Sequence, residues 1–534
     1  YSRGFASVTD AAGNVYVCGN VNGETDFDPG PDVAPLGSDG ANADVFLLKY
    51  NADGAYVWHI AVGGTGTEIP SDLCLDHSGG LLMTGRTQSF FDWDTGPDTT
   101  RFVPLGSYDG FLAKYDTSGQ FLWVRQLGGT LTDESTGVTV DTDDNVYVTG
   151  YYGATLQLGP APFSATLPFE GGVQDSYIAK YNAAGDFLWV RGLQGAGAQT
   201  AQSIACDGAG SLYTTGQFSG TTALGPTSTG VVTGAGGEGF LCKHTVDGDF
   251  VWAKSFGGPL NEKTDVVLAD GAGHVYLFGR FGNTADLDPG PGTSANTAVG
   301  AEYNAFYSKL DTSGQAIWVR TLHANTLESG TGDIAYDVSG NVFVIGNFNV
   351  TIDLDPGTGI TTAEPLYPND HFIVKFDSTG TFRWGQTIIT GDVFDTIDGL
   401  STDPEGNIVV SGSFSTSIAF DDGGAEGSFF TDIVSAGYVA KYGGELTTRA
   451  SSAVEPTFGL QVFPNPATDR VTVKPLTDLP LDRLEVLDAG GRVIWLSTGS
   501  VVTAIPVHLF ATGTYTVAVR AGGLWARSSF VVER

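Results

Sequence analysis

Residues 1–442 contain seven copies of one sequence pattern. Each copy has roughly the same order of features, namely an Asp-x-x-Gly turn, an apolar strand ending in glycine, a loop, an apolar-x-Lys-aromatic strand, and then a glycine and a tryptophan. The strand-ending glycines are spaced by 66, 65, 66, 63, 67 and 66 residues and are Gly19, Gly85, Gly150, Gly216, Gly279, Gly346 and Gly412. So regular a period indicates one supersecondary unit that buries its apolar face by stacking on its neighbours. Seven such units, rich in short strands, predict an all-β fold, the seven-bladed β-propeller.

The second copy shows how the unit divides into four strands. The first ends at Asp76, the second runs from Leu81 to Gly85, the third from Phe111 to Tyr115, and the fourth contains Trp123. The first and third connections are short turns in which glycine supplies a positive φ. Chain direction places these turns on one face of the ring and the two longer loops on the other face. Loops carry function more often than the strands they join, so the longer loops are where we expect it.

The repeat region is incomplete at its ends. Six copies carry the tryptophan of the fourth strand, namely Trp58, Trp123, Trp189, Trp252, Trp318 and Trp384. The seventh copy stops after its third strand at Tyr442, and the chain begins at the first strand of the first copy. An unpaired sheet edge is a liability, so we expect residues upstream of Tyr1 to supply the missing strand. Without Met or a signal peptide, the start is predicted to be processed or truncated.

Two charged positions recur in every copy, toward the short-turn face. Lysine occupies one of them, at Lys49, Lys114, Lys180, Lys243, Lys309, Lys375 and Lys441. Aspartate occupies the other, at Asp10, Asp76, Asp141, Asp207, Asp270, Asp337 and Asp403. A feature present in every copy is typical of a scaffold, and buried charges need partners. We therefore predict structural polar contacts within or between blades.

A second motif, Asp-x-Asp followed by Pro-Gly or Thr-Gly, occurs in four of the loops after the second strand. Its aspartates are Asp26, Asp28, Asp92, Asp94, Asp286, Asp288, Asp353 and Asp355. Residues i and i+2 of an extended segment point the same way, so each pair holds two carboxylates side by side, and like charges so placed need a counter-ion. Calcium is bound by carboxylate and carbonyl oxygens. These eight aspartates are therefore candidate Ca²⁺ ligands.

The same loops also have a purely structural interpretation. Asp-Pro-Gly is good turn chemistry in itself, and the spacing is not that of an EF-hand. The third and fourth copies lose both acids together, at Leu156-Gln157-Leu158 and Thr222-Ala223-Leu224. A further acid lies eight residues before the repeated aspartate, on the same face, at Glu68, Asp133, Glu262 and Asp395. Both interpretations of these loops, as structural turns and as cation sites, therefore stay open at this point.

Motifs for catalysis are weak. Asp116-Thr117-Ser118-Gly119 followed by Trp123 is similar to the Asp box of sialidase propellers but is one residue longer on each side, so the match fails. No Ser/His/Asp order and no Gly-rich phosphate loop stands out. A polysaccharide hydrolase or lyase that uses two loop carboxylates stays an alternative because acids are abundant, although no single pair is singled out.

Composition excludes several partners. Asp and Glu number 60 and Lys and Arg 25, which gives a net charge of −35, so nucleic acid and anionic lipid are not expected partners. Cys18, Cys74, Cys206 and Cys242 make no CxxC pair and are predicted to be buried free thiols. The scattered histidines give no zinc pattern. No apolar run reaches the roughly 18 residues of a transmembrane segment.

The periodicity ends at Tyr442, and the rest of the chain follows a different pattern. Residues 443–456 form a polar linker rich in Ser and Thr. Residues 457–534 contain short alternating strands at 460–463, 470–473, 483–487, 492–495, 514–520 and 526–532. About 80 residues of this kind predict a small Ig-like β-sandwich.

Three motifs stand in this tail in a fixed order. They are Phe463-Pro464-Asn465-Pro466, Leu487-Asp488-Ala489-Gly490-Gly491-Arg492-Val493 and Ala511-Thr512-Gly513-Thr514-Tyr515. In order and position they resemble the type A C-terminal sorting domain of type IX secretion system substrates in Bacteroidota. The residues that carry this resemblance as secretion signals are Pro464, Asn465, Pro466, Asp488, Gly491, Arg492, Gly513 and Tyr515.

The resemblance implies a cellular location and a set of partner proteins. Members of this family are exported by a signal peptide and the type IX translocon, and their partners include its outer-membrane shuttle protein and a sortase. The sortase usually removes the tail and commonly joins the protein to surface lipopolysaccharide. Residues 1–442 likewise resemble the seven-bladed propeller repeats common in exported proteins of the same bacteria, a group without one shared activity.

Three functional hypotheses follow. The first is a secreted or cell-surface, non-enzymatic binding or adhesion module, whose acidic, calcium-binding loop face engages a glycan or a surface protein. The second is a polysaccharide hydrolase or lyase, and the third a structural cargo of the secretion machinery. A funnel lined by aromatic residues with a converging acid pair would favour the enzyme, whereas a flat acidic rim would favour the binding module.

Overall fold

The structure is a computed structural model. It describes residues 2–28, 34–36, 42–101, 103–159, 165–225, 230–258, 260–288, 295–298, 303–326, 332–357, 359–365, 369–390, 395–420, 428–430, 435–443, 448–449, 459–463, 467–468, 470–476, 481–487, 493–498, 504–521 and 524–532. These residues form strands and one 3-10 turn, η2 (Val507–Leu509). Across the same ranges, no helix is long and apolar enough to cross a membrane. The chain divides into two compact units, with the main boundary between Ser451 and Ser452.

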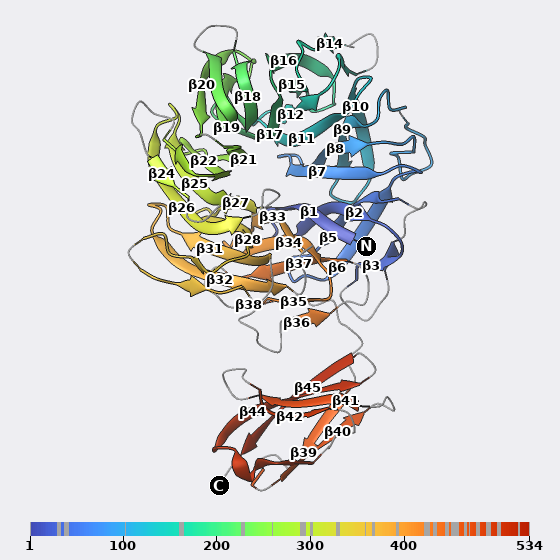
Figure 1. The fold of residues 1–534 in the computed structure, drawn as a ribbon. Coiled ribbons are helices and arrows are strands. Elements are labelled where there is room, and N and C mark those ends of the chain that lie inside the picture. The colour runs from blue at the N-terminus through green and yellow to red at the C-terminus, as the bar shows by residue number, and fades with distance from the viewer. Residues whose placement is uncertain are drawn as a thin grey trace. The chain divides into compact units, whose positions relative to one another are not determined.

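The first unit is built from seven antiparallel four-stranded arrays, counted over the described residues, which follow one another around a common centre (Figure 1). The innermost strands are β1 (Ser2–Thr9), β7 (Glu68–Leu75), β11 (Asp133–Val140), β17 (Gln199–Cys206), β21 (Lys263–Ala269), β27 (Gly332–Tyr336) and β33 (Thr396–Thr402). The second strands are β2 (Val15–Val21), β8 (Gly80–Thr87), β12 (Val146–Tyr152), β18 (Ser211–Ala223), β22 (His274–Phe281), β28 (Val342–Phe348) and β34 (Ile408–Phe414).

The two outer strands complete each array, in the curled arrangement of propeller blades. The third strands are β5 (Asp44–Tyr50), β9 (Asp109–Asp116), β15 (Asp175–Tyr181), β19 (Val231–Thr245), β25 (Tyr303–Asp311), β31 (Asp370–Phe376) and β37 (Ala436–Tyr442). The fourth strands are β6 (Tyr56–Val62), β10 (Phe121–Gly128), β16 (Phe187–Gly195), β20 (Phe250–Phe256), β26 (Ala316–Thr326), β32 (Phe382–Thr390) and β38 (Thr448–Arg449).

The repeated strand-ending glycine has a steric cause. A Cβ atom on Gly19 would lie 2.1 Å from the carbonyl oxygen of Arg3, and one on Gly150 would lie 1.9 Å from that of Glu134. The inner strands β1 and β11 each carry a β-bulge directly after the residue that pairs with the glycine. Because a bulge bends its strand, the inner carbonyl approaches the second strand, and only glycine leaves room there.

The seventh array differs from the prediction. β38 pairs with β37, with Lys441 opposite Arg449 and Tyr442 opposite Thr448. The prediction that the last blade lacks its outer strand in this chain is therefore wrong. The strand is only two residues long and lies within residues 443–456, where polar composition predicted a linker. A polar strand of two residues is too short to show the alternation of apolar and polar side chains by which strands are recognised in a sequence.

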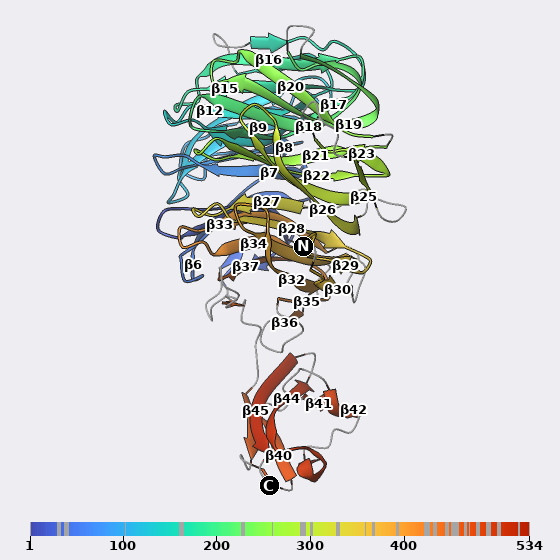
Figure 2. The same cartoon turned by 90° about the vertical axis from the view of Figure 1, so that its left-hand side faces the viewer.

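Hairpins in the loops after the second strand add a further layer of contacts. They are β3 (Thr25–Asp26) with β4 (Pro35–Leu36), β13 (Leu156–Leu158) with β14 (Ala165–Leu167), β23 (Thr284–Asp286) with β24 (Ala295–Thr297), β29 (Ile352–Asp353) with β30 (Thr362–Ala363), and β35 (Ser417–Ala419) with β36 (Ser428–Phe430). β13 pairs with β10 of the preceding array, and β35 pairs in the same way with β32. Several of these hairpins are visible at the edge of the first unit in Figure 2. The hairpins that begin with β13 and β35 each fasten one blade to the blade before it.

The second unit contains two sheets over one core. One sheet consists of β39 (Gly459–Phe463), β40 (Arg470–Leu476) and β43 (Ala504–Pro506). The other consists of β41 (Leu481–Leu487), β42 (Val493–Thr498), β44 (Gly513–Ala521) and β45 (Leu524–Val532). Val471 from the first sheet and Leu484 and Val517 from the second share one buried cluster. The strands predicted from the sequence are present, and β43 is an additional one; the Ig-like topology stays a prediction.

Candidate functional site

The first aspartate of the Asp-x-Asp motif braces its own loop. Asp92 Oδ1 accepts hydrogen bonds from the backbone N–H of Asp94 at 3.2 Å and of Thr100 at 2.8 Å. Asp26 and Asp353 accept the same two bonds, from residues two and eight positions later, at 3.1 and 2.8 Å in both loops. One carboxylate oxygen thus closes the loop across its two ends.

The second aspartate forms a tighter turn of the same kind. Asp94 Oδ1 accepts a hydrogen bond from Gly96 N–H at 2.7 Å, and Asp355 Oδ1 accepts one from Gly357 N–H at 2.8 Å. In the fifth copy it is the first aspartate, Asp286, that accepts such a bond, from the N–H of Asp288 at 3.1 Å. Side chains of Asp that bind backbone N–H groups two residues on are a regular way to fix a turn.

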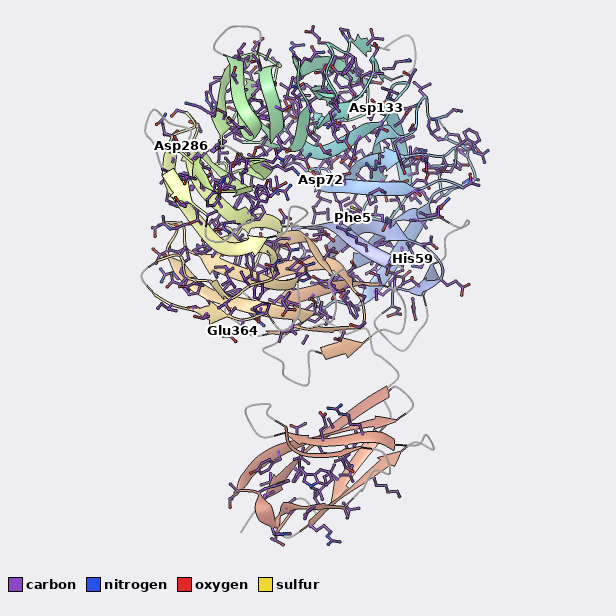
Figure 3. All side chains as sticks on the ribbon, viewed as in Figure 1. Phe5, His59, Asp72, Asp133, Asp286 and Glu364 are labelled. Carbon is purple, nitrogen blue, oxygen red and sulfur yellow. The ribbon has the colours of Figure 1, made fainter. Side chains whose placement is uncertain are left out.

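The residue between the two aspartates anchors each loop. Phe27, Trp93, Leu287 and Leu354 occupy this position and are 9%, 1%, 0% and 2% exposed. The aspartates on either side point the opposite way, because side chains alternate along an extended segment. Figure 3 shows Asp286 at the outer edge of the first unit. The motif therefore combines a buried apolar plug with two outward carboxylates.

The structure keeps the pairs in separate loops. Within the described ranges, no group of three or more His, Cys, Asp or Glu side chains lies close enough together to hold a metal ion. The assignment of the eight aspartates as Ca²⁺ ligands stays a prediction. Any bound cation would draw on one pair together with backbone carbonyls and water.

The acids that precede the repeated aspartate are buried inside the loop face. Asp133 is 0% exposed, and its two oxygens accept N–H groups of Gly129 at 2.5 Å and Gly153 at 3.1 Å. Burial raises the pKa of Asp133 to about 7. Glu262 accepts the N–H of Gly258 at 3.1 Å, and burial raises its pKa as well. These acids tie loop backbones together.

The recurring lysines and aspartates join neighbouring blades. Lys114 Nζ lies 2.6 Å from Asp76 Oδ2 of its own blade and donates to the carbonyl of Ala183 in the next blade at 3.3 Å. Lys441 repeats this at the ring closure, with Asp403 at 2.7 Å and the carbonyl of Ala52 in the first blade at 3.2 Å. The prediction of structural contacts within and between blades is confirmed for these positions.

The innermost strands carry a second set of carboxylates. Asp72 Oδ2 accepts the N–H of Val138 in the next blade at 2.9 Å, and Asp333 Oδ2 accepts that of Leu400 at 2.9 Å. Burial raises the pKa of Asp72 to about 6 and that of Asp333 to about 7. Figure 3 shows Asp72 close to the centre of the ring. These acids also serve the joints between blades.

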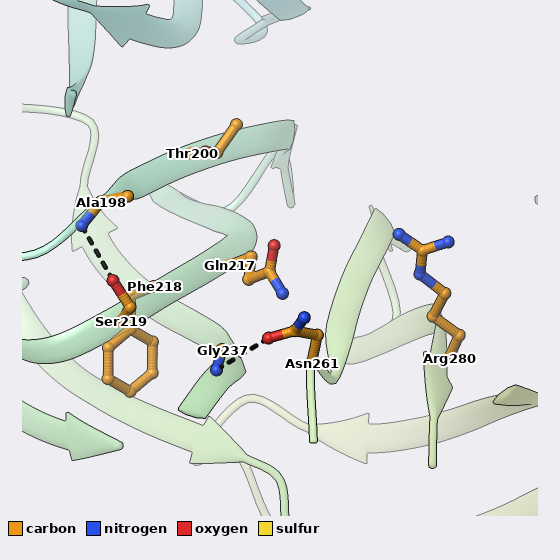
Figure 4. A pocket seen from close by; sticks show the side chains of 8 residues that line it. All are labelled: Ala198, Thr200, Gln217, Phe218, Ser219, Gly237, Asn261 and Arg280. Atoms are coloured by element: carbon orange, nitrogen blue, oxygen red, sulfur yellow. Dashed lines mark hydrogen bonds between the residues drawn. The ribbon is translucent and has the colours of Figure 1, made fainter. Parts of the chain in front are cut away.

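A cavity of about 510 Å³ lies between the fourth and fifth blades. We call it the Arg280 pocket, and it is lined by Ala198, Thr200, Gln217, Phe218, Ser219, Gly237, Asn261 and Arg280 (Figure 4). Sequence reasoning missed it. A signal was present, since the residue after the strand-ending glycine changes from copy to copy, as Asn20, Arg86, Tyr151, Gln217, Arg280, Asn347 and Ser413. In a repeat protein, a position that varies among otherwise similar copies indicates a local role.

A second cavity, of about 470 Å³, lies near the outer strands of the fifth and sixth blades. Arg320, Asp355 and Gly357 are among its lining residues. One predicted Ca²⁺ ligand, Asp355, therefore shares a cavity with an arginine. Arg320 also donates through Nε to the carbonyl of Gly380 at 3.0 Å, which assigns it a structural role between blades.

Comparison with known protein families agrees with this architecture. Residues 122–151 match the family model described as a beta-propeller repeat. Residues 461–533 match the model of the secretion system C-terminal sorting domain. The chain is a type IX secretion substrate with propeller repeats. In this secreted propeller, Pro464, Asn465, Pro466, Asp488, Gly491 and Arg492 lie outside the described residues.

Two signal residues of the secreted propeller are described. Gly513 begins β44. Tyr515 is 8% exposed in the sandwich core and donates its hydroxyl to the carbonyl of Ala511 at 2.8 Å. The Gly-Thr-Tyr motif thus fixes the start of a central strand.

Relatives of the secreted propeller add little about activity. It is 23% identical over 448 residues to a WD repeat-containing protein of Acanthamoeba polyphaga mimivirus, covering 69% of this chain and 32% of that protein. It is 25% identical over 180 residues to the regulatory protein FlaEY of Caulobacter vibrioides, covering 34% of this chain and 18% of that protein. The chain thus spans about a third or less of the length of these curated relatives.

Among solved structures, a puromycin hydrolase aligns with 87% of this chain and 57% of its own, at 12% identity and a TM-score of 0.40. At that score the likeness decides neither fold nor activity.

Proposed function

We propose that this protein is exported across the outer membrane by the type IX translocon and acts at the cell surface or outside it as a non-enzymatic binding or adhesion module. The observation that carries the proposal is the sorting domain at residues 461–533 behind a ring of propeller repeats. The translocon, its outer-membrane shuttle protein and its sortase are the partners that such a domain implies.

The proposed binding role is supported by how the loops after the second strand are held. A buried plug such as Trp93, and the hydrogen bonds that Asp92 accepts from backbone N–H groups of its own loop, fix the loop without a ligand. A surface that is pre-organised in this way loses little conformational entropy on binding. Rigid loops on a scaffold are a common basis for recognition, and here a glycan or a surface protein would be the partner.

Calcium is part of the same proposal. In the Asp-x-Asp loops, Asp26, Asp92 and Asp353 each accept their loop-closing backbone bonds through Oδ1. The second oxygen of Asp26 and of Asp353 would then face a cation, whereas Asp92 Oδ2 lies 3.8 Å from Arg101 Nη2. Such binding would reduce the repulsion that a net charge of −35 imposes on the loop face.

Export is tested with the full chain behind a signal peptide. It is produced in a type IX-competent bacterium and in the same strain without the translocon, and a matched chain without residues 457–534 serves as control. We expect the full chain outside the cells only in the competent strain. Equal amounts of both chains outside the cells would contradict the proposal.

Binding is tested separately, with the purified full chain. Calorimetric titration with CaCl₂ and a glycan array, run with calcium and with chelator, measure the two parts of the role. Retention of one class of glycan without its turnover supports a binding module. Release of shortened saccharides from the array ligands would instead favour the hydrolase or lyase alternative.

A further inference from the structure

We propose that the Arg280 pocket binds the carboxylate of an acidic sugar residue, such as a uronic acid. The inference rests on the proposed binding role and names a ligand class for it. It depends on three features of the pocket, namely the hydrogen-bond donors among its polar side chains, the lack of an ion-pair partner for Arg280 among the described residues, and its volume.

The polar groups of the pocket present mainly hydrogen-bond donors. Thr200 Oγ1 already accepts from Gln174 Nε2 at 2.6 Å, and Ser219 Oγ accepts from Ala198 N–H at 2.9 Å. Asn261 Oδ1 accepts from Gly237 N–H at 3.3 Å. Each of these oxygens already uses one of its two lone pairs within the protein, whereas the hydroxyl protons and the Asn261 amide protons are all left for a ligand. A cavity lined by donors favours an anion.

Arg280 adds a positive charge whose environment differs from that of its counterpart. Arg86, at the same position in the second blade, lies 2.9 Å from Glu134 through Nη1. Both arginines lie over a tyrosine ring, Arg280 at 5.7 Å and Arg86 at 4.9 Å, and the Nε of each is buried without a hydrogen-bond partner. The difference is the ion pair, since among the described residues no carboxylate lies within ion-pair distance of Arg280. A guanidinium binds a carboxylate through two parallel hydrogen bonds.

The remaining groups favour a sugar over a simple anion. Gln217 Nε2 donates to the backbone carbonyl of Glu262 at 3.1 Å, which orients the amide and directs its oxygen away from that bond. An amide oxygen can accept from a sugar hydroxyl. The volume, about 510 Å³, lies within the usual range for small-molecule sites. Asn261 is exposed, so the pocket reaches the surface.

The test is calorimetric titration of the full chain with two ligands that differ at one group. Glucuronic acid carries a carboxylate where glucose carries a hydroxymethyl group. We expect glucuronic acid to bind at least about tenfold more tightly than glucose, the effect of one charged hydrogen-bonded contact. Sodium sulfate is titrated as a third ligand and should bind more weakly than glucuronic acid.

Two variants and a matched control assign the binding to the pocket. Arg280→Gln removes the charge, and Asn261→Asp adds a carboxylate of nearly the same shape that can still accept from Gly237. Both should weaken the binding of glucuronic acid at least about tenfold. Arg86→Gln, at the same position in another blade, should leave the affinity unchanged. Melting temperatures of all variants confirm that they are folded.

Three outcomes would overturn the inference and are distinct from a failure of the proposed function. Equal binding of glucose and glucuronic acid, or undiminished binding by Arg280→Gln, would show that the pocket does not recognise the carboxylate, although the protein would still bind the sugar. Sulfate binding as tight as glucuronic acid would indicate a general anion site. No binding of any of the three ligands rejects the pocket, whereas the glycan array still tests the wider binding role.

Discussion

Arg3 and Asp398, which are 395 positions apart in the chain, form a two-pronged ion pair between the first and last blades. Arg3 Nε donates to Asp398 Oδ2 at 2.9 Å, and Arg3 Nη2 donates to Oδ1 at 2.6 Å. Their side chains are 31% and 6% exposed. Next to them, Ser7 and Ser401 hydroxyls lie 3.0 Å apart. These side-chain contacts between β1 and β33 help to close the ring, together with the backbone hydrogen bond from Ser2 N–H to the carbonyl of Ser435 at 3.2 Å.

Asp398→Asn should therefore weaken ring closure. One oxygen of the bidentate contact is replaced by an amide NH₂ facing Arg3, so we expect a loss of about 1–3 kcal/mol in unfolding free energy, measured by denaturant titration. Arg383→Ala is the matched control, because its pair with Asp377 has an arginine that is 57% exposed. It should cost under about 1 kcal/mol. Equal losses in the two variants would show that ring closure does not depend on this pair.

Lys114→Met should be one of the more damaging single changes. Lys114 and Asp76 are 6% and 3% exposed, so the variant leaves a buried carboxylate without its cation. We expect a loss of about 3 kcal/mol in unfolding free energy, measured by denaturant titration. The double variant Lys114→Met with Asp76→Asn should recover part of that loss, because no buried charge remains. A double variant less stable than Lys114→Met would contradict this explanation.

Three buried carboxyls should lower stability as pH rises between about 4 and 7. Two buried histidines, His244 and His371, should act in the opposite direction below about pH 6.5, because burial lowers the pKa of each to about 4. Burial raises the pKa of Asp133 and of Asp333 to about 7 and that of Asp72 to about 6, above the ordinary value of about 3.9. The folded state then binds these protons more tightly than the unfolded state. Their contribution is complete below about pH 4 and is lost as pH rises through 7.

Asp133→Asn tests that pH dependence, since it removes one of the three titrating groups. Thermal melts at steps from pH 4.5 to 8 should show a smaller decline in melting temperature for the variant than for the unchanged protein. Asp247→Asn, on a turn at the opposite face, is the control and should not alter the decline. If the curves of melting temperature against pH were parallel for all three proteins, Asp133 would not be a source of the pH dependence.

The Asp-x-Asp loops should be stabilised by their aspartates even without calcium. Asp353 Oδ1 accepts two backbone N–H bonds, so Asp353→Ala in EDTA should lower the unfolding free energy by about 1–2 kcal/mol. Asp353→Asn keeps an acceptor oxygen and should cost less. If both variants matched the unchanged protein in EDTA and differed from it only in calcium, the aspartates would serve the cation alone.

Much of the ring is predictable from the repeat. The period marked by Gly19 and its counterparts sets the number of blades, and glycine turns such as the one at Gly119, which has a φ of 85°, set the order of strands within each blade. The roles of Lys114 and Asp76 also followed from their recurrence. The local sequence pattern was enough to predict these features, because every blade repeats the same strands and turns.

The sequence by itself determined the repeat, the order of its strands and the sorting tail. Only the tertiary structure decided the outer strand β38 and the pocket around Arg280. Both depend on contacts that local sequence does not encode: β38 is held by pairing with β37, and the pocket joins Thr200, Asn261 and Arg280 from neighbouring blades. Pairing across a blade edge leaves no periodic trace in the sequence. For the pocket, the sequence shows only that the residue after the strand-ending glycine varies, and which side chains converge depends on proximity in space.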